Sequence, residues 1–263
     1  MWEVLIAMSG LRELTRWPWA GTGHGPLPAL LLILTAVTGI VDAVSYIALL
    51  HVFVANMTGN VIFLGFALAG APGLSATASA VSLGSFLLGA VAGGQVAAHV
   101  GTHRGRHLRT ATAIGLPLVL FAVIEAAVVG NPPPLGARYV LIVTLAMTLG
   151  LQNATARRLA VPDLTTTVLT LTLTGVASDS RLGGGTGGHP GRRLFAVGAM
   201  FAGALIGALL VVEVNLVLPL ALAAVLMAIT VISAHLLSPT DADWVRAAGA
   251  PPWPASQPDK ARK

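Results

Sequence analysis

The chain contains no cysteine among its 263 residues. This absence excludes disulfide bonds, zinc–thiolate sites and cysteine nucleophiles. Charge is also scarce, because charged residues make up 10% of the chain, whereas soluble domains carry about 25%. Together with a hydrophobic content of 55% and a mean hydropathy of +0.83, the low charge predicts an integral membrane protein.

Sequence motifs of catalysis are missing as well. There is no Gly-x-Ser-x-Gly, no His-Glu-x-x-His and no Gly-x-Gly-x-x-Gly that opens a helix, and the glycine-rich run 182–191 lacks the lysine of a phosphate-binding loop. Basic patches interleaved with aromatic residues, which are typical of nucleic-acid binding, are absent too. We therefore expect no enzymatic activity, no cofactor and no nucleic-acid partner.

Three histidines recur at every fourth position, at His99, His103 and His107. This spacing would place them on one face of a helix, as in some metal sites. Glycines interrupt the stretch, however, and no acidic ligand is adjacent. We interpret the run 102–109 as a solvated basic loop and expect no metal site.

Eight apolar segments are present, each bounded by breaks rich in proline, glycine or arginine. They span residues 28–50, 52–70, 76–100, 111–130, 137–157, 164–178, 193–213 and 215–236. If all eight crossed a bilayer, basic clusters would lie on both sides. If the second and sixth segments enter and return, every basic cluster and both termini lie on the cytoplasmic side, and only Arg138 lies outside. The sequence therefore predicts an all-α integral membrane fold with six full transmembrane helices and two broken, re-entrant half-helices.

The two halves of the chain resemble each other. Asp42 lies in the run Gly-Ile-Val-Asp-Ala near the end of the first segment, and Asn153 lies in Gly-Leu-Gln-Asn-Ala near the end of the fifth. Paired glycines four residues apart follow in each half, a spacing that lets helices approach closely in lipid. With three spans per half, the halves have opposite orientations, so we expect two inverted repeats. The expected divisions are an N-terminal cytoplasmic or interfacial segment 1–27, repeats 28–130 and 137–236, and a disordered cytoplasmic tail 237–263.

Polar residues at the two short segments form the candidate site, because helix-breaking polar segments at matching places in two halves indicate a binding site. They are Asp42, Asn56, Thr58, Asn60, Asn153, Asp163, Thr166 and Thr167. Asp42 is the only acidic residue deep in a span, where it could bind a proton, sodium ion or cationic group, or could lock helices together. Asn56 or Thr58 could cap the returning helix, whose N-terminus would favour an anion or a ligand carbonyl.

Several of these runs resemble the YoaK family of bacterial multi-pass membrane proteins. The resemblance rests on Gly39 to Tyr46, on the run Asn-Met-Thr-Gly-Asn that ends at Asn60, on Gln-Asn-Ala at 152–154 and on the threonine-rich run 161–170. It covers about residues 30 to 236. It implies a bacterial inner-membrane protein of about six spans, and it implies no substrate.

The function that these features favour is secondary transport, or channel-like permeation, of a small polar or anionic solute. The alternative is a structural or lipid-interacting membrane protein whose polar residues only satisfy the backbone. Besides the lipid bilayer and the solute, glycine-rich helix faces could support a homodimer. We expect a location in the bacterial inner membrane with both termini in the cytoplasm.

Overall fold

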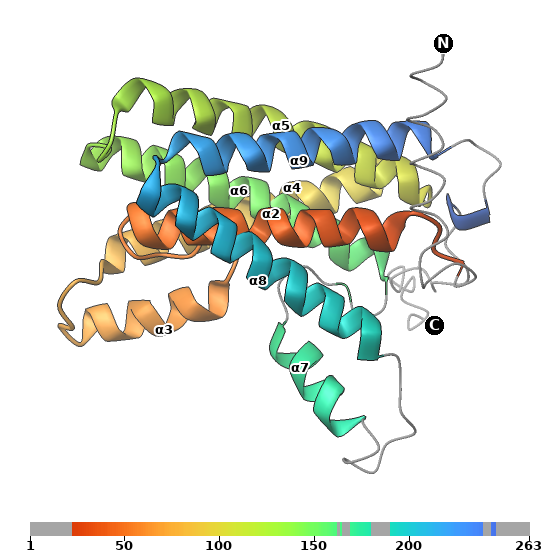
Figure 1. Cartoon of the computed structure of the whole chain (residues 1–263), viewed down its shortest axis with the longest axis horizontal. Helices are drawn as coiled ribbons and strands as arrows, with labels where there is room; N and C mark the ends of the chain where they lie inside the picture. The colour runs from red at the N-terminus through yellow and green to blue at the C-terminus, as the bar shows by residue number, and fades with distance from the viewer. Residues whose placement is uncertain (1–22, 162–163, 165–168, 180–189, 239–242, 246–263) are drawn as a thin grey trace, which may run out of the picture.

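The computed structural model describes residues 23–161, 164, 169–179, 190–238 and 243–245. These residues form α-helices and one 3-10 turn, and no strand occurs among them. Figure 1 shows the helices as an elongated bundle. Their bounds are α2 Leu27–Ala48, α3 Met57–Leu68, α4 Ala76–Val100, α5 Arg104–Val129, α6 Leu135–Leu159, α7 Leu169–Ser178, α8 Pro190–Glu213, α9 Val217–Leu236 and η2 Asp243–Val245.

Six of these helices are long and apolar enough to cross a membrane: α2, α4, α5, α6, α8 and α9. The shortest has 20 residues, about 30 Å at a rise of about 1.5 Å per residue, which matches the hydrocarbon core of a bilayer. The helices α3 and α7 have only 12 and 10 residues. The predicted all-α membrane fold, with six long helices and two short ones, is confirmed.

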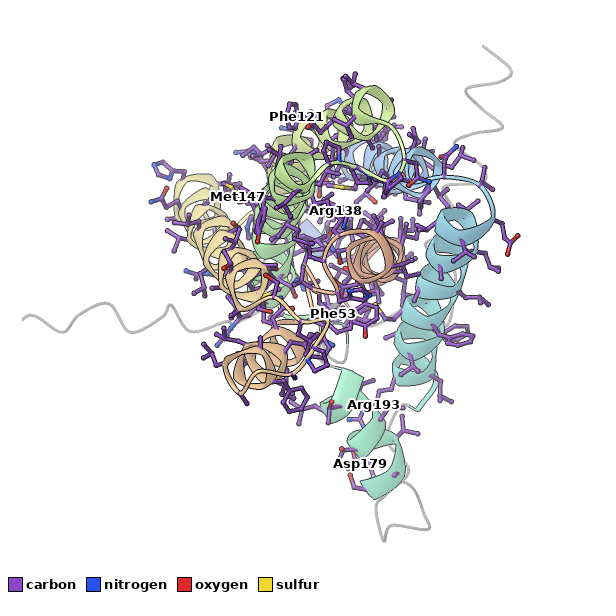
Figure 2. All side chains as sticks on the ribbon, turned by 90° about the vertical axis from the view of Figure 1, so that its left-hand side faces the viewer. Phe53, Phe121, Arg138, Met147, Asp179 and Arg193 are labelled. Atoms are coloured by element: carbon purple, nitrogen blue, oxygen red, sulfur yellow. The ribbon has the colours of Figure 1, made fainter. Side chains whose placement is uncertain are left out.

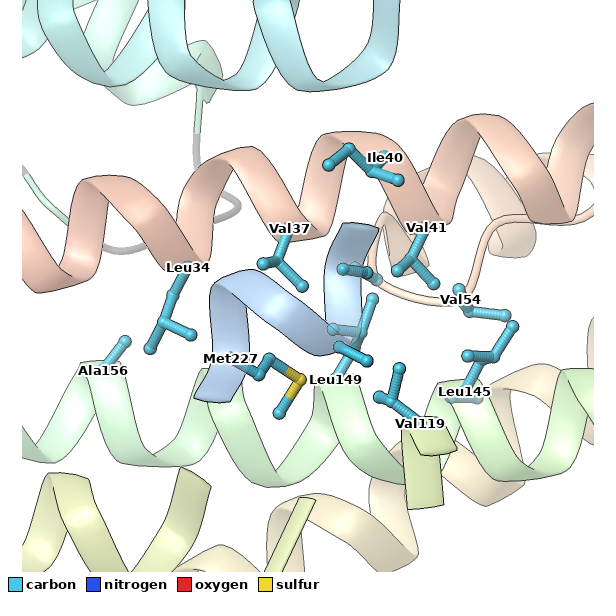
Figure 3. Close-up of a cluster of buried hydrophobic side chains, with 14 of the residues drawn as sticks. Leu34, Val37, Ile40, Val41, Val54, Val119, Leu145, Leu149, Ala156 and Met227 are labelled. Atoms are coloured by element: carbon cyan, nitrogen blue, oxygen red, sulfur yellow. The ribbon is translucent and has the colours of Figure 1, made fainter. Parts of the chain in front are cut away.

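Helix α2 lies at the centre of the bundle. Most of its apolar length is buried, whereas most of α8 is exposed to the surroundings. In Figure 3, Leu34, Val37 and Val41 of α2 face Leu145 and Leu149 of α6. The same core includes Val54, Val119 and Met227. The residues of this core come from all six long helices, including Ala78 of α4 and Ala196 of α8.

Glycines permit α2 to pack closely against α8. A Cβ atom on Gly39 would overlap the Met200 carbonyl, and a Cβ on Gly203 would overlap the Ala36 carbonyl. A Cβ on Gly207 would lie 2.8 Å from the Ile40 carbonyl oxygen. The two backbones therefore meet directly, as the glycine spacing predicted.

The same arrangement recurs between α4 and α6. A Cβ on Gly89 would overlap the Met147 carbonyl, and one on Gly93 would lie 2.8 Å from the Ala154 Cβ. A Cβ on Gly150 would overlap the Phe86 carbonyl. The first long helix of each half thus packs against the second long helix of the other half, through glycines at matching places.

The segment between α2 and α4 turns back into the bundle. Leu50 and His51 have φ values of 65° and 55°, left-handed conformations that reverse the chain after α2. Figure 1 shows α3 starting part-way along the bundle and ending near the end where α2 ends. This is the re-entrant path expected for residues 52–70. The second predicted re-entrant segment lies partly outside the described residues, since 165–168 are not among them.

The prediction of a loop over residues 102–109 is wrong, because α5 begins at Arg104. The turn after α4 needs only Gly101, with φ of 73°, and His103 caps α5 by accepting a hydrogen bond from the Arg106 N–H at 3.0 Å. Arg104 is buried and donates to the Leu159 carbonyl at the end of α6, and His107 is buried too. Tertiary contacts of these polar side chains explain why a basic run continues as helix.

Helix α7 projects away from the bundle beside α8, as Figures 1 and 2 show. Arg193 of α8 donates a hydrogen bond of 2.6 Å to Asp179, just after α7. This hydrogen bond holds the pKa of the Asp179 carboxyl below its usual value, and a hydrogen bond from Ser178 adds a smaller effect in the same direction. Because half of the Asp179 side chain is exposed, the pair positions α7 without contributing much stability.

Candidate functional site

A stripe of polar residues runs along one buried face of α2. Thr35, Thr38, Asp42 and Ser45 follow at spacings of three and four residues, and each is at most 6% exposed. The three hydroxyl groups donate to carbonyls of their own helix, at Leu31, Leu34 and Asp42. Two members of the stripe, Thr38 and Asp42, also form side-chain hydrogen bonds with groups outside α2. Asp42 is the only buried carboxylate in the described part of the chain.

The carboxylate of Asp42 holds the re-entrant segment. Its Oδ1 accepts hydrogen bonds from the N–H groups of Val54 at 2.9 Å and Ala55 at 2.8 Å. These N–H groups lie in non-helical backbone, which must be satisfied by protein when it is buried at membrane depth. Since Asp42 lies six residues before the end of α2, the segment reaches roughly 9 Å into the bundle. The structure thus gives Asp42 a structural partner and leaves its part in solute binding a prediction.

Asn60 satisfies the other side of the same segment. Its Oδ1 accepts from the Phe53 N–H at 2.9 Å, and its Nδ2 donates to the Phe53 carbonyl at 2.6 Å. The side-chain amide therefore pairs with both backbone groups of Phe53, as the backbone of a neighbouring β-strand would. Ser82 of α4 adds a second donor to the Phe53 carbonyl at 2.6 Å. Asn60 is fully buried, so this predicted site residue supports the backbone between α2, α3 and α4.

The remaining polar residues of the first cluster are separated from this network. Asn56 occupies the N-cap position of α3, but its side chain makes no cap hydrogen bond, and Thr58 and Asn56 are both exposed. The prediction that Asn56 or Thr58 caps the returning helix is therefore wrong. The structure brings Asp42 and Asn60 to the same short segment and leaves Asn56 and Thr58 on the outside of α3.

Gln152 of α6 joins the polar stripe of α2 and was not among the predicted site residues. Its Nε2 donates to the Thr38 hydroxyl at 2.9 Å and to the Leu34 carbonyl at 3.0 Å. A matching buried stripe on α6 consists of Thr144, Thr148, Gln152 and Thr155. The sequence did contain a signal for this buried polar face: polar residues recur at helical spacing within an apolar segment. We call the two facing stripes the polar seam.

A small cavity lies along the polar seam, between α2, α5, α6 and α9. Its volume is about 10 Å³, which suits a single water molecule. The polar residues that line it are Thr112, Thr148, Thr155 and Gln152, and the Oε1 atom of Gln152 has no partner in the described structure. The hydroxyls of Thr112, Thr148 and Thr155 donate to carbonyls of their own helices. The arrangement suits a hydrogen-bond donor.

The predicted residues of the second half are described only in part. Asn153 is half-buried and donates from Nδ2 to the Leu149 carbonyl at 2.9 Å. Asp163, Thr166 and Thr167 lie outside the described residues, so their place in a site stays a prediction. No group of three histidine, aspartate or glutamate side chains suited to a metal ion occurs within the part of the chain that the structure describes.

A bundle of six membrane-length helices around a buried polar seam defines an all-α, multi-pass membrane protein. The chain belongs to the family described as "Protein of unknown function (DUF1275)", which matches residues 30–233. It is also similar to the "UPF0700 transmembrane protein YoaK" of Bacillus subtilis (strain 168). The two are 30% identical over 150 residues, which cover 57% of this chain and 65% of that protein's length. The family resemblance predicted from the sequence is thereby confirmed, and no solved structure matches the chain.

Proposed function

We propose that this protein is a secondary transporter, or a channel-like permease, for a small polar or anionic solute. The observation that carries the proposal is the Asp42 carboxylate, buried in the central membrane helix and bonded to re-entrant, non-helical backbone. An ionisable group at such depth is costly, and in membrane proteins it commonly marks a substrate or ion pathway. Broken helices near the midplane are a recurrent way to build transporter sites.

The packing of the two halves supports an inverted-repeat mechanism. Helix α2 of the first half packs against α8 of the second half. Helix α6, the counterpart of α2, packs against α4 of the first half through matching glycine contacts. If the halves are inverted repeats, rocking of one pair against the other would open the polar seam alternately to either side. The cavity that the described residues form along the seam has a volume of about 10 Å³, which corresponds to an occluded conformation under this proposal.

The same proposal places the protein in the bacterial cytoplasmic membrane with both termini inside. Support comes from the basic side chains of Arg104, Arg106, Arg157 and Arg158, which gather at the ends of α5 and α6 that lie nearest the start of α2. Under the proposal no chemical step is catalysed, because Asp42 has no second buried carboxylate among the described residues with which to share acid–base work.

A second function is favoured by one specific observation. Asp42 and Asn60 direct their hydrogen bonds to backbone groups of Phe53, Val54 and Ala55, which is what a purely structural network would do. A structural or lipid-interacting membrane protein, with no solute pathway, would need these same contacts. The two functions differ over the negative charge of Asp42, which transport would use and scaffolding would not.

The test is solute entry into liposomes that contain the purified protein. Stopped-flow light scattering would follow swelling in glycerol, urea, formate, acetate and nitrate, with and without an imposed pH gradient. We expect at least one solute to enter faster than in protein-free liposomes, and Asp42→Asn to remove most of that excess. Glu213→Gln is the control, since this exposed carboxylate at the end of α8 lies away from the seam. Equal rates for Asp42→Asn and the unaltered protein would favour the structural role.

A further inference from the structure

A polar cavity of about 200 Å³ lies between the start of α5 and the end of α9. Arg106 and Arg109 of α5 line it from one side, spaced by three residues so that they share a helix face. His235 and Ser238 line it from the end of α9. These ends of α5 and α9 lie together at one end of the bundle in Figure 1.

Two histidines at this cavity have a ring nitrogen placed to accept a hydrogen bond. The Nδ1 atom of His103 accepts a hydrogen bond from the backbone N–H of Arg106 at 3.0 Å. The Nδ1 atom of His235 lies 2.8 Å from Nη1 of Arg109, and a guanidinium can only donate, so this Nδ1 accepts as well. An imidazole nitrogen that accepts carries no proton. Each ring therefore holds its single proton on Nε2 and offers a further N–H donor.

The charge of the two arginines is not compensated within the described structure. Among the described residues, none that lines the cavity is acidic, and neither Arg106 nor Arg109 forms an ion pair with one of them. The exposed carboxylates whose side chains the structure describes are Glu125, Asp179 and Glu213, which lie near the end of α5, just after α7 and at the end of α8. The cavity therefore presents two guanidinium groups and imidazole N–H donors, a set that recognises phosphate oxygens.

Apolar surface flanks the cavity on the membrane side. Ile232 and Leu236 of α9 are 57% and 56% exposed. Ile232 lies one helical turn from His235, on the adjoining part of the same face. A free anion would gain nothing from these side chains, whereas a lipid would place its acyl chains against them.

We propose that this cavity binds the phosphate of an anionic phospholipid, with Arg106 and Arg109 at the phosphate and the acyl chains along α9. Basic pockets between helices at the cytoplasmic side of a membrane are suited to such headgroups. The site is independent of the transport proposal, because it lies at the end of the bundle and shares no residue with the polar seam.

Native mass spectrometry of the full chain in detergent tests the proposal. The probes are dioleoyl phosphatidylglycerol, dioleoyl phosphatidylcholine and inorganic phosphate. We expect the phosphatidylglycerol adduct to be retained in preference to phosphatidylcholine, and Arg106→Gln/Arg109→Gln to weaken its binding about 25-fold, about fivefold for each arginine. The matched control is Arg157→Gln/Arg158→Gln, which removes the same charge from exposed positions at the end of α6. It should bind like the unaltered protein.

Three outcomes would overturn the proposal. Equal weakening of lipid binding in both double variants would show that binding depends on general surface charge. Equal retention of the two lipids would show that the headgroup is not recognised. Displacement of the lipid by millimolar phosphate would indicate a site for a free anion. If the double variant does not fold, Arg106→Gln alone decides the matter. Its exposed side chain has no described partner to lose, so about a fivefold weakening is expected from it.

Discussion

Gln152 of α6 donates a hydrogen bond of 2.9 Å to the hydroxyl of Thr38 in α2. The two residues are 114 positions apart and belong to different halves of the chain. Each is almost completely buried. This bond is where the two polar stripes meet, so the seam at the centre of the bundle is shared by both halves.

The strength of this contact can be measured with a double-mutant cycle. We expect Thr38→Val and Gln152→Leu to show a coupling free energy of about 0.6 kcal/mol, and at most about 1.7 kcal/mol, as for other hydrogen bonds between membrane helices. Unfolding by sodium dodecyl sulfate in mixed micelles would give the four stabilities. Additive effects would show that the bond contributes nothing to stability.

Loss of the negative charge of Asp42 and loss of its hydrogen-bond acceptor should have different effects on the stability of the protein. Asp42→Asn keeps an Oδ1 acceptor for the N–H groups of Val54 and Ala55, so we expect the unfolding free energy to change by less than about 1 kcal/mol. Asp42→Leu removes the acceptor and leaves both N–H groups without a partner. At about 1–3 kcal/mol for each group, this variant should lose about 2–6 kcal/mol. Similar stabilities of the two variants would contradict this structural role.

Whereas Asp42→Asn should preserve stability, the reverse change from amide to carboxylate, Asn60→Asp, should lower it. Asn60→Asp keeps an acceptor for the Phe53 N–H, but its ionised carboxylate has no hydrogen to donate to the Phe53 carbonyl. We expect the ionised form to lose about 1–3 kcal/mol of stability for the missing donor. Thermal unfolding in detergent, compared with Thr58→Val on the exposed face of α3, measures the effect. A variant as stable as the control would show that the amide donor is dispensable.

Glycine substitutions at the two helix crossings should be costly, whereas neighbouring glycines should tolerate the change. Gly93→Ala places a methyl group against Ala154 and the Leu151 carbonyl, but Gly94→Ala enters open space on the same helix. The same comparison applies to Gly203→Ala and Gly198→Ala in α8. We expect a loss of about 1–3 kcal/mol for the first member of each pair and none for the second. Equal melting temperatures within a pair would contradict the close packing.

Accessibility of single cysteines would establish the path of the segment around α3, since the chain has no natural cysteine. His51→Cys and Pro72→Cys lie at exposed positions before and after the re-entrant segment, and Thr102→Cys lies in the exposed turn after α4. In intact cells, a membrane-impermeant maleimide should label positions 51 and 72 alike and label position 102 only after lysis. Labelling of positions 51 and 72 from opposite sides would show that the segment crosses the membrane.

Much of the fold followed from patterns that depend on neighbours in sequence. Runs of about 20 apolar residues predicted the six long helices, and the placement of arginine distinguished them from the two short ones. The glycine pairs at 89 and 93 and at 203 and 207 predicted close helix contacts, and those contacts are present. Only the partners of these glycines could not be derived, because spacing within one helix does not specify the facing helix.

The polar residues were harder to interpret. Asp42 and Asn60 were identified as important and are buried together at one segment, but Asn56 and Thr58, which share the same run, are exposed. The basic run around Arg104 was predicted to be a loop because its charges suggested solvent, yet Arg104 is buried against the end of α6. In both cases the partner groups lie far away in sequence, so local composition could not assign them.

The sequence by itself determined that this is a multi-pass membrane protein without cysteine chemistry. Each apolar segment enters the lipid according to its own hydropathy and charge, so its partners in the fold need not be known. Only the tertiary structure decided what the buried polar atoms do. Backbone groups in an apolar interior must find partners, and the fold supplies them: Asp42 and Asn60 from two helices for the re-entrant segment, and Gln152 for Thr38 across the halves.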